Sequence, residues 1–530
     1  MALPDIYTEG IASGWKVIDA AKLTAPQTME ADVAIIGSGA GGGVAAEILT
    51  LSGLKVLLLE EGALRTSDSF KDMDEGRALR ELYQEGAARA TSDGAIAVLQ
   101  GRSVGGSTTV NWTSSFRTPE PTLKFWAAER EVVGHGVEDM KPWFEQMEKR
   151  LDVMLWEAQN ANNSVLKRGC DKLGWEAHAI PRNVRGCWNS GYCGFGCPVN
   201  AKQSMLVSTI PEALRHGATL VHRLRVRQLQ HASDKITGAV GEALRDDGRT
   251  PSGTLVTIKA RHFIAAGGAI NTPALLLRSQ LPDPHKQLGQ HTLIHPVVLS
   301  LAQMPERIDP FYGAPQSTAS DHFQWKDGAT GPMGYKLEVP PIFPGICAGV
   351  LNAYGDDLRK EMAALPHTNA VLALLRDGFV EQSPGGSIRL ADDGSPMRDY
   401  ELSDYVWEGV RRAYLSMAEL QFAAGAQRVR QAHIDASYQT SWTDAKKAIA
   451  ELPLKKFRAT LFTAHLMGGC AMSQNPKRGV VDSGGRHHQL ANLSVMDGSV
   501  FPTSIGANPQ LSIYGLVAQN ATALAKQLKT

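Results

Sequence analysis

The stretch from Val33 to Gly62, VAIIGSGAGGGVAAEILTLSGLKVLLLEEG, has the pattern of a strand, a glycine-rich turn, a helix and a second strand. Gly37 suits the tight turn, Gly39 lets the backbone approach a pyrophosphate, and Gly42 lets the helix pack closely on the strand. The start of the helix offers N–H groups and the positive end of a dipole to phosphates. Glu60 ends the second strand, where a carboxylate can accept hydrogen bonds from both ribose hydroxyls. The stretch therefore predicts a site for an adenine dinucleotide, without deciding between NAD and FAD.

The composition is typical of a soluble globular protein with a large core. Of 530 residues, 43% are hydrophobic and 20% are charged, and 54 basic residues balance 54 acidic ones. The sequence contains no basic run, so nucleic acid is not an expected partner. No apolar stretch approaches the roughly 18 residues of a membrane span, and no secretory signal is visible at the N-terminus. We therefore expect a cytoplasmic protein, with peripheral membrane contact left open.

Two further segments carry glycines where a backbone could press against a bulky ligand. Residues 99–117 read LQGRSVGGSTTVNWTSSFR, with apolar and aromatic flanks in place of the charges of an ordinary surface turn. Residues 265–269, AAGGA, join a predicted strand to a predicted helix over 271–279, as at a sheet edge that faces the cofactor a second time. Residues 298–455 have mixed strands and proline-rich turns, and fit a substrate-facing domain better.

Four segments, in the same order along the chain, resemble the glucose–methanol–choline (GMC) oxidoreductases, a family of FAD-dependent enzymes. The matching segments are residues 31–62, GRSVGGSTTVN (101–111) with Arg117, GGAINTPALLLRS (267–279), and HLMGGCAM (465–472) with SVMDGSVFPTSIGANPQLSIYGLVAQNA (494–521). Gln280 stands where the family usually has glycine. The resemblance favours FAD over NAD, and is greatest to bacterial long-chain alcohol dehydrogenases and oxidases.

The resemblance implies an α/β fold, α+β overall, with a Rossmann-like FAD-binding domain. A discontinuous substrate-binding domain is expected to be built on an antiparallel sheet with helices. The FAD-binding domain is expected over residues 28–117, 187–297 and 456–530. The substrate-binding domain is expected over residues 118–186 and 298–455.

The resemblance also implies roles for single residues. His465 is the implied catalytic base and Asn508 the second active-site residue, while His295 matches a segment in which it is structural. A neutral imidazole suits removal of a hydroxyl proton, and an amide can hold an oxygen that gains negative charge. The flavin is expected to be noncovalent, because Val110 occupies the position at which some members attach it through histidine. The predicted cofactor contacts are Gly37, Gly39, Gly42, Glu60, Gly101, Gly105, Gly106, Ser107, Asn111, Val226, Gly268, Asp497 and Pro509.

Three of the six cysteines, Cys187, Cys193 and Cys197, lie close together in the sequence. Thiolates at such spacings can hold an iron–sulfur cluster, and the segment resembles that of FAD-dependent sugar dehydrogenases, which carry a three-iron cluster. It resembles equally the CGxGC segment of long-chain alcohol oxidases and dehydrogenases, in which the cysteines are taken as structural. Three ligands are too few for an ordinary closed zinc site. We favour structural thiols and expect no metal.

The expected function is FAD-dependent oxidation of an aliphatic, medium- to long-chain primary alcohol to the aldehyde. Hydride would pass to flavin N5, with His465 as the base. One alternative is an FAD-dependent sugar or polyol dehydrogenase with an iron–sulfur cluster at the three cysteines. Another is a flavoprotein lyase without redox chemistry. The expected partners are a small-molecule alcohol and an electron acceptor, which is either oxygen or a quinone-type compound.

Overall fold

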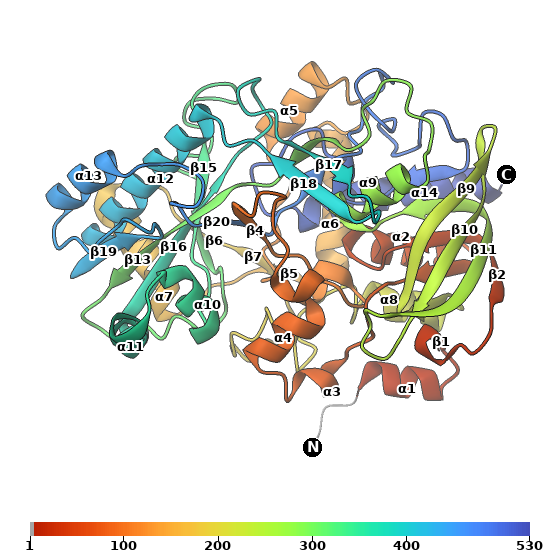
Figure 1. Cartoon of the computed structure of the whole chain (residues 1–530), viewed down its shortest axis with the longest axis horizontal. Coiled ribbons are helices and arrows are strands. Elements are labelled where there is room, and N and C mark those ends of the chain that lie inside the picture. Colours follow the sequence, from red (N-terminus) through yellow and green to blue (C-terminus); the bar gives the residue numbers. More distant parts are fainter. Residues whose placement is uncertain (1–4, 530) are drawn as a thin grey trace.

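The computed structural model describes residues 5–529 and arranges them around two large sheets at opposite ends of the long axis (Figure 1). Strands β2, β9, β10 and β11 of the first sheet lie on the right in this view. Strands β13 and β16 of the second sheet lie on the left, beside α7, α12 and α13. The chain between the two sheets forms the site described below.

The first sheet has a parallel centre built from buried apolar runs. Its strand order is β1-β8-β3-β2-β11-β10-β9, and β22 pairs with β11. In this order, the strands β1, β8, β3, β2 and β11 pair in parallel, and β22 is parallel to β11. Strands β10 and β9 continue the sheet with antiparallel pairing. The bounds are β1 (Lys16–Asp19), β2 (Gln27–Ile36), β3 (Val56–Leu59), β8 (Thr219–His222), β9 (Leu224–Ala232), β10 (Lys235–Leu244), β11 (Pro251–Ala265) and β22 (Leu493–Val495).

Helix α2 (Ala40–Leu51) begins in the glycine turn after β2 and is almost entirely buried. It packs against α14 (Gln510–Lys529) and α8 (Thr209–Arg215), and α14 packs in turn against α6 (Val137–Arg150). Helix α9 (Gly268–Arg278) follows β11 and packs against β9. Parallel strands joined through buried helices confirm the expected Rossmann-like α/β class.

The second sheet is mainly antiparallel. Its order is β4-β20-β13-β16-β15-β14-β6, with β19 also paired to β13, and only the β4–β20 pair is parallel among the described residues. The bounds are β4 (Ile96–Val98), β6 (His178–Ala179), β13 (Val297–Gln303), β14 (Thr318–Ser320), β15 (Tyr335–Glu338), β16 (Thr368–Leu375), β19 (Arg428–Gln431) and β20 (Leu461–Thr463).

Alternating side chains give this sheet two apolar faces. On β13, Val298 and Ala302 join a core beneath α7 (Ala161–Leu173), α12 (Asp404–Ala423) and α13 (Trp442–Glu451). Val297, Leu299 and Leu301 point the other way and join a core with α10 (Pro344–Leu351) and α11 (Gly355–Ala363). Because successive side chains of a strand point to opposite faces, the mostly apolar sequences of β13 and β16 fit a sheet that is covered on both sides.

The remaining elements are short. A small sheet has the order β18-β17-β12-β21, and β5 pairs with β7. Their bounds are β5 (Val153–Leu155), β7 (Pro181–Asn183), β12 (Gln290–Leu293), β17 (Gly386–Leu390), β18 (Pro396–Tyr400) and β21 (Met467–Gly468). The other helices are α1 (Ile6–Ala12), α3 (Ser67–Phe70), α4 (Glu75–Leu82), α5 (Glu120–Glu129), η1 (Ala20–Lys22), η2 (Gln84–Ala87), η3 (Gly106–Thr109), η4 (Leu365–His367) and η5 (Gly498–Val500).

The chain crosses between the two sheets more often than the predicted domain segments suggest. Strands β4 and β20 belong to segments predicted for the FAD-binding domain, yet they form one edge of the second sheet. Helix α6 belongs to a segment predicted for the substrate-binding domain, yet it packs against α14. Within residues 5–529, none of the helices combines the length and apolarity that crossing a bilayer requires.

Candidate active site

A cavity of about 670 Å³ lies between the two sheets. Its walls include the turns that follow β2, β3, β11 and β22, together with residues of β13, β16 and β20. The cavity thus lies beyond the carboxyl ends of these strands, which is where open α/β sheets bind their ligands. The predicted site residues that line it are Gly37, Gly39, Glu60, Gly101, Gly106, Ser107, Asn111, Val226, Gly268, His465, Asp497, Asn508 and Pro509.

Gly42 and Gly105, also predicted to contact the cofactor, do not line the cavity. A Cβ atom on Gly42 would lie 1.8 Å from the carbonyl oxygen of Gly37, so Gly42 allows α2 to pack against its own turn. The N–H of Gly105 donates to Ser38 Oγ at 3.0 Å and joins the two glycine loops. Both residues therefore support the cavity wall from behind.

The wall in front of α2 leaves room for a ligand at Gly39. A Cβ atom on Gly39 would come no closer than 3.8 Å to an atom outside its own turn, that atom being Gly106 Cα. Gly39 is also the N-cap of α2, so the free N–H groups of the helix start at this point. Open space beside a helix start is the arrangement that binds phosphate, and it fits the pyrophosphate of a dinucleotide.

Glu60 lines the cavity, and hydrogen-bond donors surround its carboxyl group. Oε2 accepts from the Ser38 N–H at 3.0 Å and from Ser38 Oγ at 2.5 Å, and Oε1 accepts from the Gly62 N–H at 2.7 Å. Burial raises the pKa of Glu60, against the opposing effect of these donors. These contacts fix the orientation of the carboxyl group that is predicted to bind the ribose.

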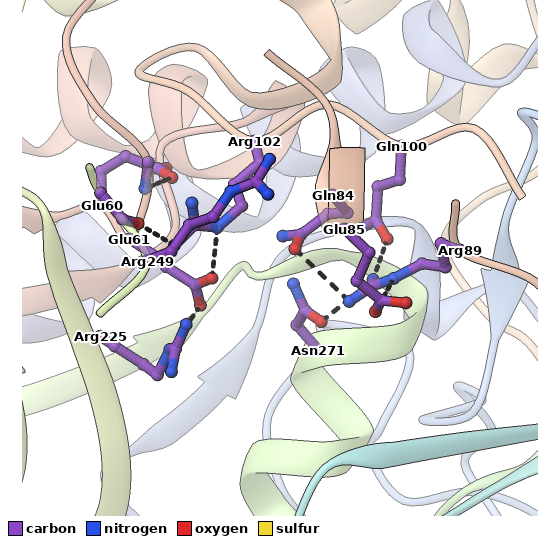
Figure 2. A network of polar contacts seen from close by, with 12 residues as sticks. Glu60, Glu61, Gln84, Glu85, Arg89, Gln100, Arg102, Arg225, Arg249 and Asn271 are labelled. Atoms are coloured by element: carbon purple, nitrogen blue, oxygen red, sulfur yellow. Dashed lines mark hydrogen bonds and ion pairs between the residues drawn. The ribbon is translucent and has the colours of Figure 1, made fainter. Parts of the chain in front are cut away.

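A network of arginine and acidic residues, drawn with Glu60 in Figure 2, also lines the cavity. Glu61 pairs with Arg102 at 2.5 Å and with Arg225 at 3.5 Å. Burial favours a higher pKa for Glu61, but the arginines outweigh it and lower the pKa to about 2. Arg89 donates to Gln100 Oε1 at 2.7 Å and pairs with Glu85 at 2.8 Å. Glu61 and Arg102 lie within segments that resemble the family but were not predicted to contact the cofactor, and Arg89 and Arg225 lie outside those segments.

Asp497 anchors the turn between β11 and α9. Its Oδ2 accepts from the Gly268 N–H at 2.8 Å and from Thr272 Oγ1 at 2.6 Å, and its Oδ1 accepts from the Ser499 N–H at 2.8 Å. Burial raises the pKa of this carboxyl group. The predicted contact residues Asp497 and Gly268 therefore form one unit on the cavity wall.

His465 and Asn508, predicted from distant parts of the sequence, both line the cavity. Nδ1 of His465 lies 3.3 Å from Nδ1 of His295, whose Nε2 accepts from the Gly506 N–H at 3.1 Å. No hydrogen bond holds Nε2 of His465 among the described residues, so this nitrogen is left to meet a ligand. Burial, with a smaller contribution from Lys336, lowers the pKa of His465 to about 4 and keeps the ring neutral.

Asn508 has two polar neighbours that the sequence did not predict. Its Nδ2 donates to Glu338 Oε2 at 3.2 Å, and the same oxygen accepts from Gln316 Nε2 at 2.6 Å. Gln316 lines the cavity, and its Oε1 accepts from Ser114 Oγ at 2.8 Å. Glu338 and Gln316 lie in a part of the chain without a recognisable motif, and only the folded chain brings them to Asn508.

Beside His465 and Asn508, the cavity has an apolar wall. Its members come from the second sheet and from the loop after η3. All of them belong to, or pack against, the core that includes Cys347 and Leu351 of α10. They are Trp112, Val297, Leu372, Leu374 and Phe462.

The cysteine segment packs against the loop that carries Asn111. Lys202 is buried, and its Nζ donates to the carbonyl oxygens of Thr109, Asn111 and Cys193 at 2.7, 2.8 and 2.6 Å. Cys187, Cys193 and Cys197 are free thiols. Among residues 5–529, no three Cys, His, Asp or Glu side chains are grouped so as to hold a metal ion. Lys202 thus connects this segment to the cavity wall through backbone contacts.

Related proteins match most of the chain. Long-chain-alcohol oxidase FAO4B of Arabidopsis thaliana is 28% identical over 505 residues, which are 91% of this chain. The match covers 65% of the plant protein, so the chain spans less than two thirds of that relative's length. An uncharacterized GMC-type oxidoreductase, y4nJ of Sinorhizobium fredii, is 30% identical, and the match covers 93% of this chain and 94% of that protein.

The fold also has solved counterparts. Formate oxidase from Aspergillus oryzae superimposes with a TM-score of 0.69 at 15% identity, covering 96% of this chain and all of the other. Models of the GMC oxidoreductase family match residues 79–297 with their N-terminal part and residues 382–516 with their C-terminal part. These matches take in more than half of the sequence, and the chain belongs to the GMC oxidoreductase family.

Proposed function

We propose that the chain oxidises an aliphatic, medium- to long-chain primary alcohol to the aldehyde, with FAD as the hydride acceptor. The observation that carries the proposal is that His465 and Asn508 meet an apolar wall at one end of a dinucleotide cavity. The plant relatives are long-chain-alcohol oxidases, which supports the same class of substrate.

GMC oxidoreductases are FAD-binding flavoproteins, and the residues of the cavity fit this cofactor. The space in front of Gly39 suits the pyrophosphate, and Glu60 suits the ribose. Val110 lines the cavity but has no side-chain group that could bond to the flavin, so we propose noncovalent binding. FAD, when bound, supplies the atom that receives the hydride.

His465 is proposed to accept the hydroxyl proton at Nε2. Its lowered pKa keeps the ring neutral, and so able to accept, at any pH above about 4. A base at Nε2 must carry its own hydrogen on Nδ1, which faces Nδ1 of His295. His295 must then accept at that nitrogen, so the contact between the Gly506 N–H and His295 Nε2 has to open. The proposal therefore includes a change of tautomer in this histidine pair.

Asn508 is proposed to donate a hydrogen bond to the same substrate oxygen. The oxygen gains negative charge as the proton leaves, and a fixed amide N–H in a dry cavity stabilises that charge strongly. One hydrogen of the Asn508 amide is committed to Glu338, and the other is available. The apolar wall formed by residues such as Leu372 and Phe462 would receive the alkyl chain and exclude water.

The proposal is tested by anaerobic visible spectra of the purified holoprotein with 1-butanol, 1-octanol, 1-dodecanol and glucose, using dodecane as a control that cannot be oxidised. We expect the flavin bands to bleach with the alcohols, most readily with the longer ones, and to persist with glucose and dodecane. Bleaching by glucose alone would favour a sugar dehydrogenase. Persistence of the bands with the three alcohols and with glucose would contradict a redox function of this class.

A further inference from the structure

Glu338 is a completely buried acidic residue next to the active site, and the mechanism above assigns it no role. It ends β15, and its exposed fraction is 0%. It pairs across the sheet with Ala319 on one side and with Leu372, a residue of the cavity wall, on the other. A buried carboxyl group is costly unless hydrogen bonds or a cation compensate it, so its contacts indicate what it does.

Two carboxamide groups supply the hydrogen bonds to Glu338, and both line the cavity. Oε2 accepts from Gln316 Nε2 at 2.6 Å and from Asn508 Nδ2 at 3.2 Å, while Oε1 is buried and has no hydrogen-bond partner within residues 5–529. An ionised carboxylate can only accept hydrogen bonds. Both amides must therefore turn their NH2 groups toward Glu338, which fixes the direction in which each amide faces the cavity.

No cation forms a hydrogen bond with Glu338 among the described residues. Lys336, two positions earlier on the same strand, forms an ion pair with Asp321 at 2.9 Å. Burial raises the pKa of Glu338 to about 7, and Lys336 and Asn508 lower it while Asp321 raises it. The charge of Lys336 and the hydrogen bond from Asn508 thus favour the ionised form against burial. Because the direct hydrogen bonds to Glu338 come from two amides on the cavity wall, the contacts point to a role at the active site rather than in the sheet.

We propose that Glu338 is a positioning residue, which holds the Asn508 amide in the orientation that meets the substrate oxygen. This inference rests on the proposed function, because the role of Asn508 is part of it. Glu338 does not line the cavity, so it acts through Asn508 and Gln316 and not by touching the substrate.

The inference predicts a pH dependence separate from that of His465. Above about pH 7 the Glu338 carboxylate only accepts, and the amides keep their orientation. Below that pH the protonated group can donate a hydrogen bond, and the Asn508 amide is free to turn its oxygen toward it. The turnover number should therefore rise with pH through about 7, well above the pKa of about 4 of His465.

Glu338→Gln tests this with a side chain of nearly the same shape. A glutamine amide can donate as well as accept, so it no longer imposes one orientation on Asn508. We expect full FAD content, a turnover number lower by roughly 10- to 100-fold, and loss of the pH step near 7. Glu338→Asp, which keeps the carboxylate, should recover part of the rate and retain the pH step.

The matched control is Glu47→Gln, in a glutamate of α2 that is also buried but pairs with Arg150 away from the cavity. It should leave both the rate and the pH step unchanged. Because Glu338 is proposed to act through Asn508, adding Glu338→Gln to Asn508→Ala should lower the rate little further. A wild-type rate and pH step in Glu338→Gln would overturn the inference. A rate loss in the double variant equal to the product of the two single-variant losses would also overturn it.

A second measurement does not depend on turnover. Infrared titration of the wild-type holoprotein should show a carboxyl group with a midpoint near 7, and this group should be missing in Glu338→Gln. In Asn508→Ala the midpoint should rise, because the carboxylate loses a donor. A midpoint that does not move would overturn the inference. If no alcohol reduces the wild-type flavin, the proposed function fails, while this titration still decides whether Glu338 and Asn508 are coupled.

Discussion

Among single residues, His465 has the most specific proposed role, because it is the group that takes the hydroxyl proton. His465→Ala removes this group and leaves the residues around the dinucleotide in place, so the protein should still bind FAD. We expect anaerobic flavin reduction by 1-dodecanol to slow by about 10²- to 10⁴-fold, which stopped-flow absorbance would measure. The control is His285→Ala, at an exposed histidine outside the cavity. Reduction of His465→Ala at the wild-type rate would contradict the role.

Single site residues could be predicted from the sequence where they belong to a motif of known spacing and function. His465, Asn508, Gly39, Glu60 and Asp497 were predicted in this way, and all line the cavity. Their roles in binding and catalysis stay predictions. Glu338 and Gln316 could not be found, because their relation to Asn508 depends on the pairing of β14, β15 and β16. Pairing between strands that are far apart in the sequence produces no local sequence pattern that could be recognised.

At the level of secondary-structure elements, the turn between β2 and α2 and the first turn of α2 contain two glycines with different roles: Gly39 leaves space for the cofactor, and Gly42 allows close packing. Gly39→Val should fold, because the new side chain points into open space beside Gly106, but should lose FAD, because it occupies the place of the pyrophosphate. Gly42→Val should instead destabilise the fold, because its Cβ would lie 1.8 Å from the Gly37 carbonyl oxygen. Flavin content and thermal unfolding of the apoproteins distinguish the two. A fully loaded Gly39→Val protein would refute this account of the turn.

Helix α10, which backs the apolar wall, is held at its start by a residue from α4. Glu75 accepts from the Gly345 N–H at 2.8 Å and from the Ile346 N–H at 2.9 Å. Glu75→Ala removes this cap, at a cost of about 1 kcal/mol, and should speed hydrogen exchange in residues 344–351. Asp356→Ala on the exposed surface of α11 is the control. Unchanged exchange in Glu75→Ala would show that the cap does not hold α10.

At the scale of the whole molecule, buried neutral histidines make stability depend on pH. Burial lowers the pKa values of His222, His262, His465 and His487 to about 4 each. The unfolded chain binds protons first, near pH 6.5, so stability should fall as the pH falls from about 6.5 toward 4. The lowered pKa of Glu61, about 2, acts in a more acidic range, below about pH 4.5.

Thermal unfolding followed over a pH series checks this prediction. The melting temperature should decline below about pH 6.5, and the decline should be shallower in His262→Gln, which removes one buried histidine outside the cavity. A constant melting temperature between about pH 6.5 and 4 would contradict the prediction.

The general architecture followed from the sequence, but the path of the chain through it did not. Glycine turns after apolar runs predicted the Rossmann-like sheet, because each turn type requires its own residues. The crossing of β4 and β20 into the second sheet was not expected, since short strands at a sheet edge carry little periodicity. The arginine network around Glu61 likewise exists only once separate loops meet (Figure 2).

The proposed reaction removes a hydride from the carbinol carbon of an aliphatic alcohol beside His465 and Asn508. The most direct measurement compares anaerobic flavin reduction by 1-dodecanol and by the same alcohol deuterated at both hydrogens of its first carbon. We expect both alcohols to bleach the flavin, the deuterated one clearly more slowly, and dodecanal to be the product. Bleaching at equal rates without aldehyde, or no bleaching with either alcohol, would contradict it.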